Sequence, residues 1–326
     1  MGTAAEPQHR ITWGPLMGFR HEALLYAGID QFVARTTPFI TGALEADEPI
    51  LVVVSGPKIA ALRIAVGEDA DRVQFRDMSE VGANPARIIP AWHDFVDAHA
   101  GQGRRLRGIG EPIYPERTAC ELVESQRHEA LLNVAFDGAP DFWLLCPYNT
   151  QALDPTVIET AHRTHPVVTD DHGHSSSHLY PGVAGSVAPY NMGLTEPAAP
   201  GETLVFGAKG LPSVRRLVSR EAAGAGFTTR PISDLVLAVN EVATNSVLHG
   251  GGAGTLRIWR DGGVLVCEVR DRGHLEDPLA DRRRPTPNQH GGRGLWLANQ
   301  LCDLVQIRSF PSGTTVRMHM HRDRSR

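Results

Sequence analysis

A glycine-terminated helical stretch, residues 235–254, constrains this chain more than any other segment. It reads LVLAVNEVATNSVLHGGGAG, and apolar side chains recur at the spacing of one helix face, at Leu235, Val239, Val242 and Ala243. Glu241, Asn245 and His249 follow one another at intervals of four residues, so they stack on one polar face of the helix. Because asparagine is a mediocre helix former that prefers caps and turns, Asn245 inside so apolar a helix indicates a function.

The polar face of this helix suits a nucleotide site. The neutral amide oxygen of Asn245 is a suitable ligand for Mg²⁺, a hard cation that also holds substrate phosphates. Glu241, one turn earlier, would orient or deprotonate a hydroxyl near those phosphates. A solvent-facing polar stripe is the alternative explanation, and the helix by itself does not decide between the two.

Two glycine-containing turns downstream favour the nucleotide explanation. The predicted strand in VCEVRDRGH ends at Asp271, whose carboxylate can accept hydrogen bonds from an exocyclic amine such as that of adenine, and Gly273 lets a flat base approach the backbone. The segment HGGRGLWLANQL carries Gly292 and Gly294 at the start of a helix, where free N–H groups and the helix dipole favour phosphate. Each turn alone is weak evidence, because glycine-rich turns are common.

In this order and at these distances, the three segments resemble the N, G1 and G2 boxes of the ATPase superfamily shared by gyrase, heat-shock chaperones, histidine kinases and mismatch-repair proteins. The resemblance covers residues from about 203 to 320. The compact size is similar to that of the anti-sigma regulatory factors, which are serine/threonine protein kinases. The resemblance implies a two-layer α/β sandwich of the histidine-kinase-like ATPase type that binds ATP and Mg²⁺. It implies that Glu241 is the catalytic base, that Asn245 binds Mg²⁺, and that Asp271 and Gly273 contact adenine. The remaining implied nucleotide-binding residues are His249, Gly292, Arg293, Gly294 and Leu295.

One departure from the anti-sigma pattern concerns the stabilisation of transition-state charge. An arginine often precedes the G2 glycines in that family, whereas this chain has His290 near that place and Arg293 between the glycines. A first hypothesis is a signal-responsive serine kinase that binds a sigma factor or phosphorylates an anti-sigma antagonist by transfer from ATP. A second is a non-catalytic module in which ATP gates the capture of a partner protein.

A sensor histidine kinase is the third hypothesis, because the sequence RHEALL superficially resembles a phosphoacceptor box. Both copies of RHEALL lie inside a pattern of alternating strands and helices, and no heptads precede the ATPase-like segment. This hypothesis is therefore the weakest of the three.

The N-terminal half alternates between apolar runs and helical segments. Runs such as PILVVVS, RVQFRDM, RRLRGIGEP and DFWLLCPY predict four strands, and HEALLYAGIDQFVARTTPFI is the first of the predicted helices. This alternation predicts a mostly parallel sheet with helices on both faces. The segment after the first predicted strand, VVVSGPKIAAL, lacks the spacing and the Ser/Thr of a phosphate-binding loop, so we expect no nucleotide site in this half.

Several short motifs in this half resemble, in their order, the MEDS sensory domain, which was first described in methanogens and methylotrophs and is similar to a RecA-like fold. The motifs are FRHEALL, GPK, NPARIIPAW, GIGEP, QRHEALLN and CPY. The resemblance covers residues from about 16 to 168. It implies a sensory role, with a small molecule as one kind of ligand.

The repetition of RHEALL raises the question of a shared pocket. His21, Glu22, His128 and Glu129 would line one ligand pocket together with Glu111, if the repetition is functional. The simpler alternative is that each pair flanks a helix and the repetition is chance. The strand-end segment GIGEP, residues 108–112, is the better pocket candidate, because ligands collect at the carboxyl ends of parallel strands.

Residues 169–201 change composition sharply toward Gly, Pro, Ser and Ala, and periodicity disappears. We therefore expect an interdomain linker between a sensory domain at 16–168 and an ATPase domain at 202–321. A flexible linker is a simpler explanation of its acidic and histidine side chains than a metal site. These side chains are Asp170, Asp171, His172, His174 and His178.

Two further segments of the ATPase half have readable local signals. TLRIWRDGGVLVCEVRD predicts a hairpin that turns at Asp261–Gly262, as part of a mixed sheet. Residues 274–290 are polar and proline-rich and include Arg282, Arg283 and Arg284, so we expect a mobile basic lid over the phosphates.

Composition bounds the class of protein. A chain of 326 residues, 41% hydrophobic and 21% charged, is long enough for two globular domains. The net charge of −5 provides no general attraction to nucleic acid or to anionic lipid. Four widely spaced cysteines without a C-x-x-C motif are expected to be buried thiols and not a zinc site: Cys120, Cys146, Cys267 and Cys302. With neither a signal-peptide pattern nor a membrane-spanning run, we expect a cytoplasmic protein; a homodimer stays open.

Overall fold

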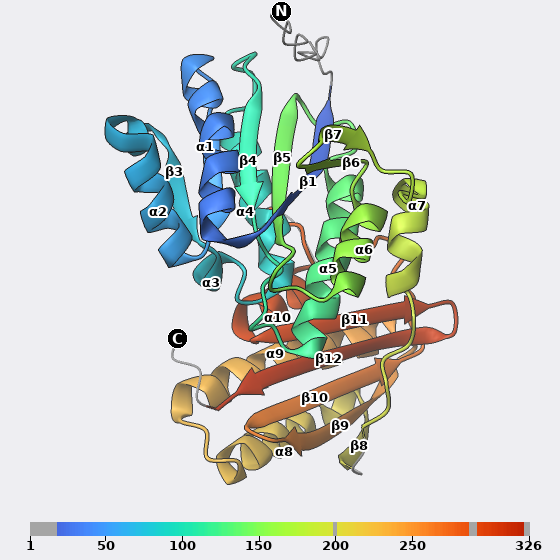
Figure 1. Cartoon of the computed structure of the whole chain (residues 1–326). Coiled ribbons are helices and arrows are strands. Elements are labelled where there is room, and N and C mark those ends of the chain that lie inside the picture. The colour runs from blue at the N-terminus through green and yellow to red at the C-terminus, as the bar shows by residue number, and fades with distance from the viewer. Residues whose placement is uncertain (1–17, 198–200, 287–291, 323–326) are drawn as a thin grey trace, which may run out of the picture.

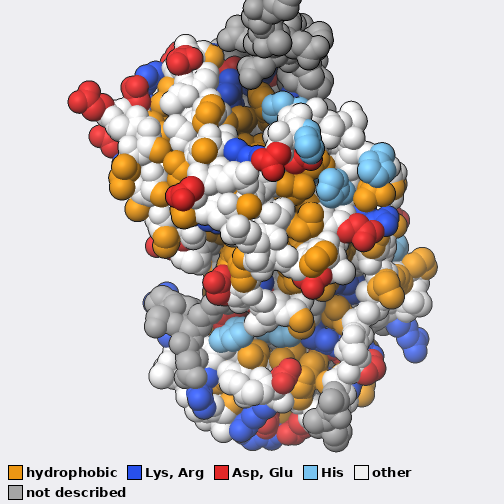
Figure 2. All heavy atoms as spheres, in the orientation of Figure 1, with side chains coloured by type: hydrophobic (Ala, Val, Ile, Leu, Met, Phe, Trp, Pro, Cys, Tyr) orange, Lys and Arg blue, Asp and Glu red, His pale blue; other side chains and the backbone are white. Residues whose placement is uncertain are grey.

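The computed structural model describes residues 18–197, 201–286 and 292–322, which form two α/β units that meet at a waist (Figures 1 and 2). The strands of the N-terminal unit are β1 (Phe19–Tyr26), β2 (Ile50–Val54), β3 (Gln74–Asp77), β4 (Leu106–Gly110), β5 (Phe142–Asn149), β6 (Val167–Asp170) and β7 (Gly173–Ser176). They form one sheet in the order β3-β2-β4-β5-β1-β6-β7. Every neighbouring pair is parallel except β6 and β7.

Helices cover both faces of this sheet (Figure 1). They are α1 (Gly28–Glu45), α2 (Gly56–Val66), α3 (Met78–Val81), α4 (Ile88–Ala98), α5 (Ala119–Ala135) and α6 (Pro155–Thr164). Phe32 of α1 packs with Val52 in one core, whereas Trp92 of α4 packs with Leu51 in another. Neighbouring residues of one strand are thus buried on opposite faces, which explains the unbroken apolar run of β2.

The C-terminal unit is a two-layer sandwich. Its strands are β8 (Glu202–Gly207), β9 (Ala253–Asp261), β10 (Val264–Asp271), β11 (Leu304–Phe310) and β12 (Gly313–His321). Its helices are α8 (Leu211–Gly224), α9 (Thr229–His249) and α10 (Arg293–Leu301), which share one core with the sheet. The strand order is β11-β12-β10-β9-β8. The predicted fold class is confirmed in both units, although this sheet is antiparallel in its described pairs and not mixed.

The opposite face of the C-terminal sheet is polar yet largely buried, because the N-terminal unit lies against it. Arg317 of β12 donates to Glu268 of β10 at 2.6 Å, and both side chains are buried. Arg308 of β11 donates at 2.7 Å to Glu124 of α5, a helix that otherwise belongs to the N-terminal core. No helix in the described ranges is long and apolar enough to cross a bilayer.

The prediction of a helix across residues 21–40 is wrong at its start. Residues Phe19–Tyr26 form β1, which lies between β5 and β6 in the sheet, and the helix begins at Gly28, whose φ of +75° separates the two elements. A strand buried on both faces loses the alternation of polar and apolar residues. Its short apolar run then resembles a helix segment.

The segment expected to be a linker contains regular structure. β6 and β7 add a hairpin to the N-terminal sheet, and α7 (Gly182–Val187) packs against α5. β7 is exposed along its whole length, so its small polar residues lack an apolar periodicity by which to recognise a strand. Other local predictions are confirmed: the hairpin turns at Asp261–Gly262, and Asp154 caps α6 by accepting from the Thr156 N–H.

Candidate functional site

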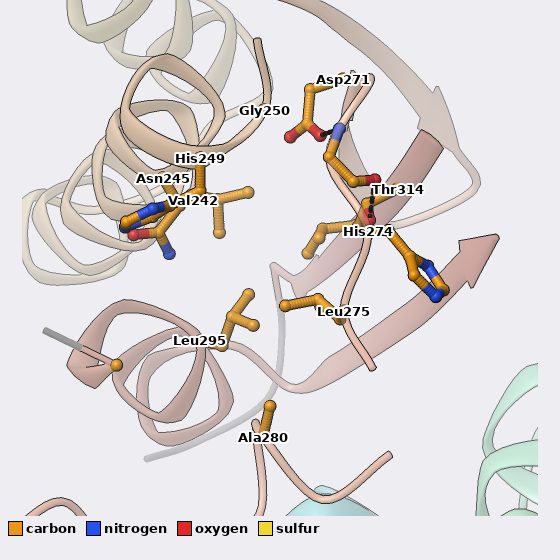
Figure 3. Close-up of a pocket in the computed structure, with 13 residues that line it drawn as sticks. Val242, Asn245, His249, Gly250, Asp271, His274, Leu275, Ala280, Leu295 and Thr314 are labelled. Carbon is orange, nitrogen blue, oxygen red and sulfur yellow. Dashed lines mark hydrogen bonds between the residues drawn. The ribbon is translucent and has the colours of Figure 1, made fainter. Parts of the chain in front are cut away.

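Six of the nine predicted site residues line one cavity of about 200 Å³ where α9, β10 and α10 meet (Figure 3). Those that line it are Asn245, His249, Asp271, Gly273, Gly292 and Leu295. Side chains from the end of α9 face the turn after β10 across this space, and Leu275 and Leu295 give it an apolar wall (Figure 3). Such a cavity, apolar with a few polar groups, suits a flat organic ring.

The Asp271 carboxylate is held in a fixed orientation at the end of β10. Its Oδ2 accepts a hydrogen bond of 2.6 Å from the Ser246 hydroxyl, and its Oδ1 accepts one of 2.8 Å from the Gly273 N–H. An ionised carboxylate has about four acceptor positions, so acceptor capacity remains for a ligand. Ser246 lies one residue after Asn245 and is fully buried; its role was not predicted, because it depends on the packing of α9 against β10.

Two glycines allow the end of α9 to approach the turn after β10. A Cβ on Gly250 would lie 2.5 Å from Cγ of Asp271, and a Cβ on Gly273 would lie 2.9 Å from the His249 carbonyl oxygen. Both distances are shorter than real Cβ contacts, so a side chain at either position would push this turn away. The sequence predicts the need for a glycine at 273 but does not single out Gly250.

Glu241 and Asn245 lie beside the start of α10. A Cβ on Gly294 would be 2.8 Å from Asn245 Nδ2 and 3.3 Å from Glu241 Cβ, so this glycine lets α10 approach α9. Both side chains are half-buried, and among the described residues neither head group forms a hydrogen bond. Gly292 adopts a left-handed conformation, φ +75°, as the N-cap of α10. The free N–H groups of α10 therefore start next to an amide and a carboxylate that have no hydrogen-bond partner within the described ranges.

Other residues of the site depart from the expectations or were missed by them. Arg293 is exposed and donates to the Thr286 carbonyl at 3.3 Å, and His290 lies outside the described residues. Thr314 of β12 also lines the cavity, and its hydroxyl donates to the Gly273 carbonyl at 2.8 Å. No sequence signal identifies Thr314, because its position follows from strand register, opposite Asp271.

The expectation of a basic lid over the phosphates is wrong for the three arginines. Arg282 is fully buried and turns to the N-terminal unit, where it lies 3.8 Å from Glu124. Arg283 pairs with Asp277, and Arg284 pairs with Asp94 at 3.0 Å. The neighbouring residues that do line the cavity are His274, Leu275 and Ala280. The three arginines thus lie beside carboxylates, either nearby in the chain or across the domain boundary.

A second cavity, of about 510 Å³, opens at the carboxyl ends of the N-terminal strands, where the segment 108–112 was expected to form a pocket. Glu111 follows β4 and accepts from the Tyr26 hydroxyl and the Lys58 ammonium, both at 2.5 Å. Burial raises the pKa of the Glu111 carboxyl, and Lys58 opposes this shift. The sequence indicated Glu111 but not its partners, which come from β1 and α2.

The residues of the repeated RHEALL motif do not line one pocket with Glu111. His21 and Glu129 meet, with His21 Nε2 and Glu129 Oε2 3.0 Å apart, on one face of the sheet. Glu22 lies on the opposite face, where its carboxylate contacts His174 of β7 at 2.6 Å. Alternation along β1 explains this separation, because successive side chains of a strand point to opposite faces.

Two families of known proteins match this chain, one in each structural unit. Residues 20–166 match the MEDS family, the MEthanogen/methylotroph, DcmR Sensory domain, and residues 208–320 match the histidine kinase-like ATPase domain. The chain joins a MEDS sensory domain to a histidine kinase-like ATPase domain. The cavity between α9, β10 and α10 therefore lies in the ATPase domain.

Individual relatives align with between 32% and 40% of this chain. Anti-sigma F factors of two Thermoanaerobacter strains are 28% identical over 114 residues, which are 32% of this chain and 80% of each relative. Among solved structures, the RsbU and RsbW domains of a Mycobacterium tuberculosis protein match at 23% identity and a TM-score of 0.29, over 39% of this chain and 34% of that one. The histidine kinase domain of the E. coli osmosensor EnvZ matches at 14% identity and a TM-score of 0.23, over 40% of this chain and 95% of that one.

Helix α10 connects the ATPase cavity to the MEDS domain. Its first residues border the cavity, and at its other end the Arg87 guanidinium donates to the carbonyls of Asn299 at 2.7 Å, Gln300 at 2.9 Å and Cys302 at 3.0 Å. Asn84 donates to the Asn299 side chain at 3.1 Å. The free carbonyls that end every helix are thus satisfied here by a cation from the MEDS domain.

Proposed function

We propose that this chain is a signal-responsive, ATP-binding regulator and an anti-sigma-type protein serine kinase. It would bind a sigma factor or phosphorylate an anti-sigma antagonist in the cytoplasm. The observation that carries the proposal is the convergence of Asn245, Asp271 and Gly292 on one cavity of the ATPase domain. Similarity to anti-sigma F factors over 80% of their length supports the choice of this kind of partner.

Each residue would have a distinct part in the reaction. The Asn245 amide oxygen would hold Mg²⁺, which neutralises phosphate charge, and the fixed Asp271 carboxylate would accept from the adenine amine. The N–H groups at the start of α10 would bind phosphate oxygens. Glu241, one turn from Asn245, would orient the serine hydroxyl of the partner protein and take its proton as the γ-phosphoryl group is transferred.

An ATP-gated binding module without phosphoryl transfer is the second candidate. Arg293, the described cation nearest to the proposed phosphate turn in sequence, is exposed and directed to the Thr286 carbonyl. If Arg293 keeps this orientation when nucleotide is bound, its charge does not stabilise the transition state of phosphoryl transfer. ATP would then act only by changing the conformation of the domain.

Burial disfavours a sensor histidine kinase that uses the RHEALL motifs. His21 and His128 are each 1% exposed in the MEDS core, so neither imidazole is open to attack on a nucleotide. A phosphoacceptor histidine has to reach the γ-phosphate, which these two can do only if the core opens.

Nucleotide binding tests the site. We expect Mg²⁺-dependent ATP binding by calorimetry, and Asn245→Ala should weaken it by about tenfold or more, because a charge-assisted contact worth about 1.5–3 kcal/mol is lost. Asn240→Ala is the matched control, since Asn240 lies on α9 but accepts a hydrogen bond from Arg215 at 2.8 Å, away from the cavity. Equal affinities for the Asn245 variant and the native protein would refute the assignment.

Phosphoryl transfer separates the kinase from the gated module. The protein would be incubated with labelled ATP, Mg²⁺ and a serine-bearing anti-sigma antagonist. Acid-stable label on the antagonist, absent with Glu241→Gln, supports the kinase. Intact ATP binding without transfer supports the module, and acid-labile label on the chain itself would favour the histidine kinase.

A further inference from the structure

Four buried side chains of the MEDS domain converge at one point in its core. They are His21 on β1, Glu129 on α5, Cys146 on β5 and His165, which follows α6. Each is at most 1% exposed. One nitrogen, oxygen or sulfur atom from each lies within 4.8 Å of the corresponding atoms of the others. Because the four come from different elements, the fold itself brings them together.

Three of the distances between these atoms are close to those of a small coordination sphere. His21 Nε2 lies 3.0 Å from Glu129 Oε2 and 3.4 Å from Cys146 Sγ, and His165 Nε2 lies 3.3 Å from the same Glu129 oxygen. In a tetrahedral zinc site with metal–nitrogen bonds of about 2.0–2.1 Å, neighbouring ligand atoms are about 3.3 Å apart.

In each imidazole, the hydrogen bond formed by the outer nitrogen, Nδ1, determines that the inner nitrogen, Nε2, carries the lone pair. His21 Nδ1 lies 3.1 Å from the Asn133 side-chain oxygen, and the Asn133 amide nitrogen donates in turn to the Thr164 carbonyl. His165 Nδ1 lies 2.8 Å from the Ala161 carbonyl oxygen. Both Nδ1 atoms face acceptors and therefore carry the hydrogen, so both Nε2 lone pairs point inward. Metal-bound histidines are held by the same kind of outer hydrogen bond.

The interior of the cluster is therefore rich in acceptors. Nε2 of His165 and Oε1 of Glu129 are buried and form no hydrogen bond with any residue that the structure describes. A buried carboxylate that faces lone pairs is costly unless a cation lies between them.

We propose that His21, Glu129, Cys146 and His165 bind one divalent transition-metal ion of the Zn²⁺ class in the MEDS core. Binding forms a metal–sulfur bond, and the Cys146 thiol releases its proton to solvent. One carboxylate, one thiolate and two neutral imidazoles then balance the charge of the ion. Imidazole and thiolate ligands favour Zn²⁺ over Mg²⁺ or Ca²⁺, and four protein ligands make a closed, structural site. The expectation that the cysteines form no zinc site considered only cysteine pairs, and this set has one cysteine.

Metal content of the full-length protein is the test. Tag-free protein, purified without chelator, should contain about one equivalent of zinc or another first-row metal per chain, as four-ligand structural sites do. Cys146→Ala and His165→Ala should lose it. Cys120→Ser and Cys267→Ala should keep it, since one changes an exposed thiol and the other a buried thiol of the ATPase domain.

A second measurement does not depend on whether the variants fold. Native protein refolded with Co²⁺ in place of Zn²⁺ should show a thiolate-to-cobalt charge-transfer band and intense ligand-field bands of tetrahedral cobalt. Two results would overturn the proposal: native protein that carries no metal and takes up neither Zn²⁺ nor Co²⁺ on refolding, or bound metal that survives Cys146→Ala and disappears with His172→Ala and His174→Ala. Native protein that binds no metal would mean that protons, and not a metal ion, bridge the four side chains.

Discussion

At the scale of single residues, the proposed adenine site depends on a missing methyl group. Gly250 has an ordinary φ of −98°, so no backbone strain requires glycine there. Space requires it, because a Cβ would overlap the Asp271 carboxylate that Ser246 and the Gly273 N–H hold in place. The orientation of Asp271 and the close approach of α9 to the turn after β10 therefore both require that residue 250 has no side chain.

Gly250→Ala should weaken nucleotide binding by about tenfold or more, because displacing Asp271 breaks hydrogen bonds to a charged group that contribute about 1.5–3 kcal/mol. Calorimetry with ATP and Mg²⁺ measures this loss. Gly193→Ala is the control, since a Cβ there would meet nothing within 4 Å. An alanine at 250 that leaves the affinity unchanged would contradict the assigned role of Asp271.

The buried His319 of β12 makes the free energy of unfolding depend on pH. Burial lowers its pKa to about 4, helped by the charge of Arg317, and its Nε2 lies 3.1 Å from the Gln306 side-chain oxygen. The unfolded chain takes up this proton near pH 6.5, so the stabilisation is complete above that pH and falls as the pH drops toward 4. At pH 4.5 the loss from this group should be about 2 kcal/mol.

Urea unfolding at pH 7 and pH 4.5 measures this contribution. His319→Gln should lose less free energy of unfolding between the two pH values than the native protein does. The exposed His172→Gln should leave the difference unchanged. Identical pH dependence in native protein and His319→Gln would show that the proton binds elsewhere.

At the scale of elements, local signals were predictable and long-range ones were not. The Asp261–Gly262 turn and the Asp154 cap depend on neighbouring residues and were found from the sequence. The sequence of β1 resembles a helix because burial on both faces removes the alternation of polar and apolar residues. The lid arginines were misassigned because a partner such as Glu124 lies more than a hundred residues away. The sequence motifs point to several of the residues that line the cavity, whereas the positions of Ser246 and Thr314 depend on how α9 and β12 pack.

The two glycines of GIGEP show how packing can imitate a ligand motif. Gly108 and Gly110 point to the same face of β4, and a Cβ on either would lie less than 3 Å from the Trp92 indole, at 2.9 and 2.8 Å. The two glycines make room for α4 against the sheet. The side chain of Glu111, the next residue, reaches the cavity at the carboxyl ends of the strands.

Gly110→Ala should therefore destabilise the MEDS domain by about 1–3 kcal/mol through overpacking against Trp92. Chemical unfolding followed by tryptophan fluorescence is the measurement. Gly110→Ala combined with Trp92→Phe, which shortens the ring system, should recover part of the loss. If the double variant is no more stable than the sum of the single changes predicts, the contact with Trp92 is not the cause.

At the scale of the whole molecule, α10 contacts both the ATPase cavity and the MEDS domain. Arg87 holds the carboxyl end of α10, and the amino end of the same short helix borders the cavity. A ligand that moves Arg87 would therefore alter the N–H groups offered to phosphate. This coupling requires that the sensory signal changes the segment that carries Arg87, residues 85–87.

Arg87→Ala should lower the free energy of unfolding by about 2–4 kcal/mol, because three carbonyls lose a charged donor, and it should also weaken ATP binding. Thermal unfolding with and without ATP measures both effects. Arg104→Ala is the control, since Arg104 forms an exposed pair with Asp47 far from α10. A variant that is less stable but binds ATP as tightly as the native protein would mean that the contact joins the domains without coupling them.

Helix α5 belongs to two interiors at once, and this limits how the protein can be recombined. Its carboxyl half packs in the MEDS core through Ala130 and Leu131, while Glu124 in its amino half meets Arg308 of the ATPase sheet. A chimera that grafts this sensory half onto a foreign ATPase would leave Glu124 opposite an unselected surface. A chimera that keeps this contact must therefore carry the outward face of α5 together with the ATPase domain that follows it.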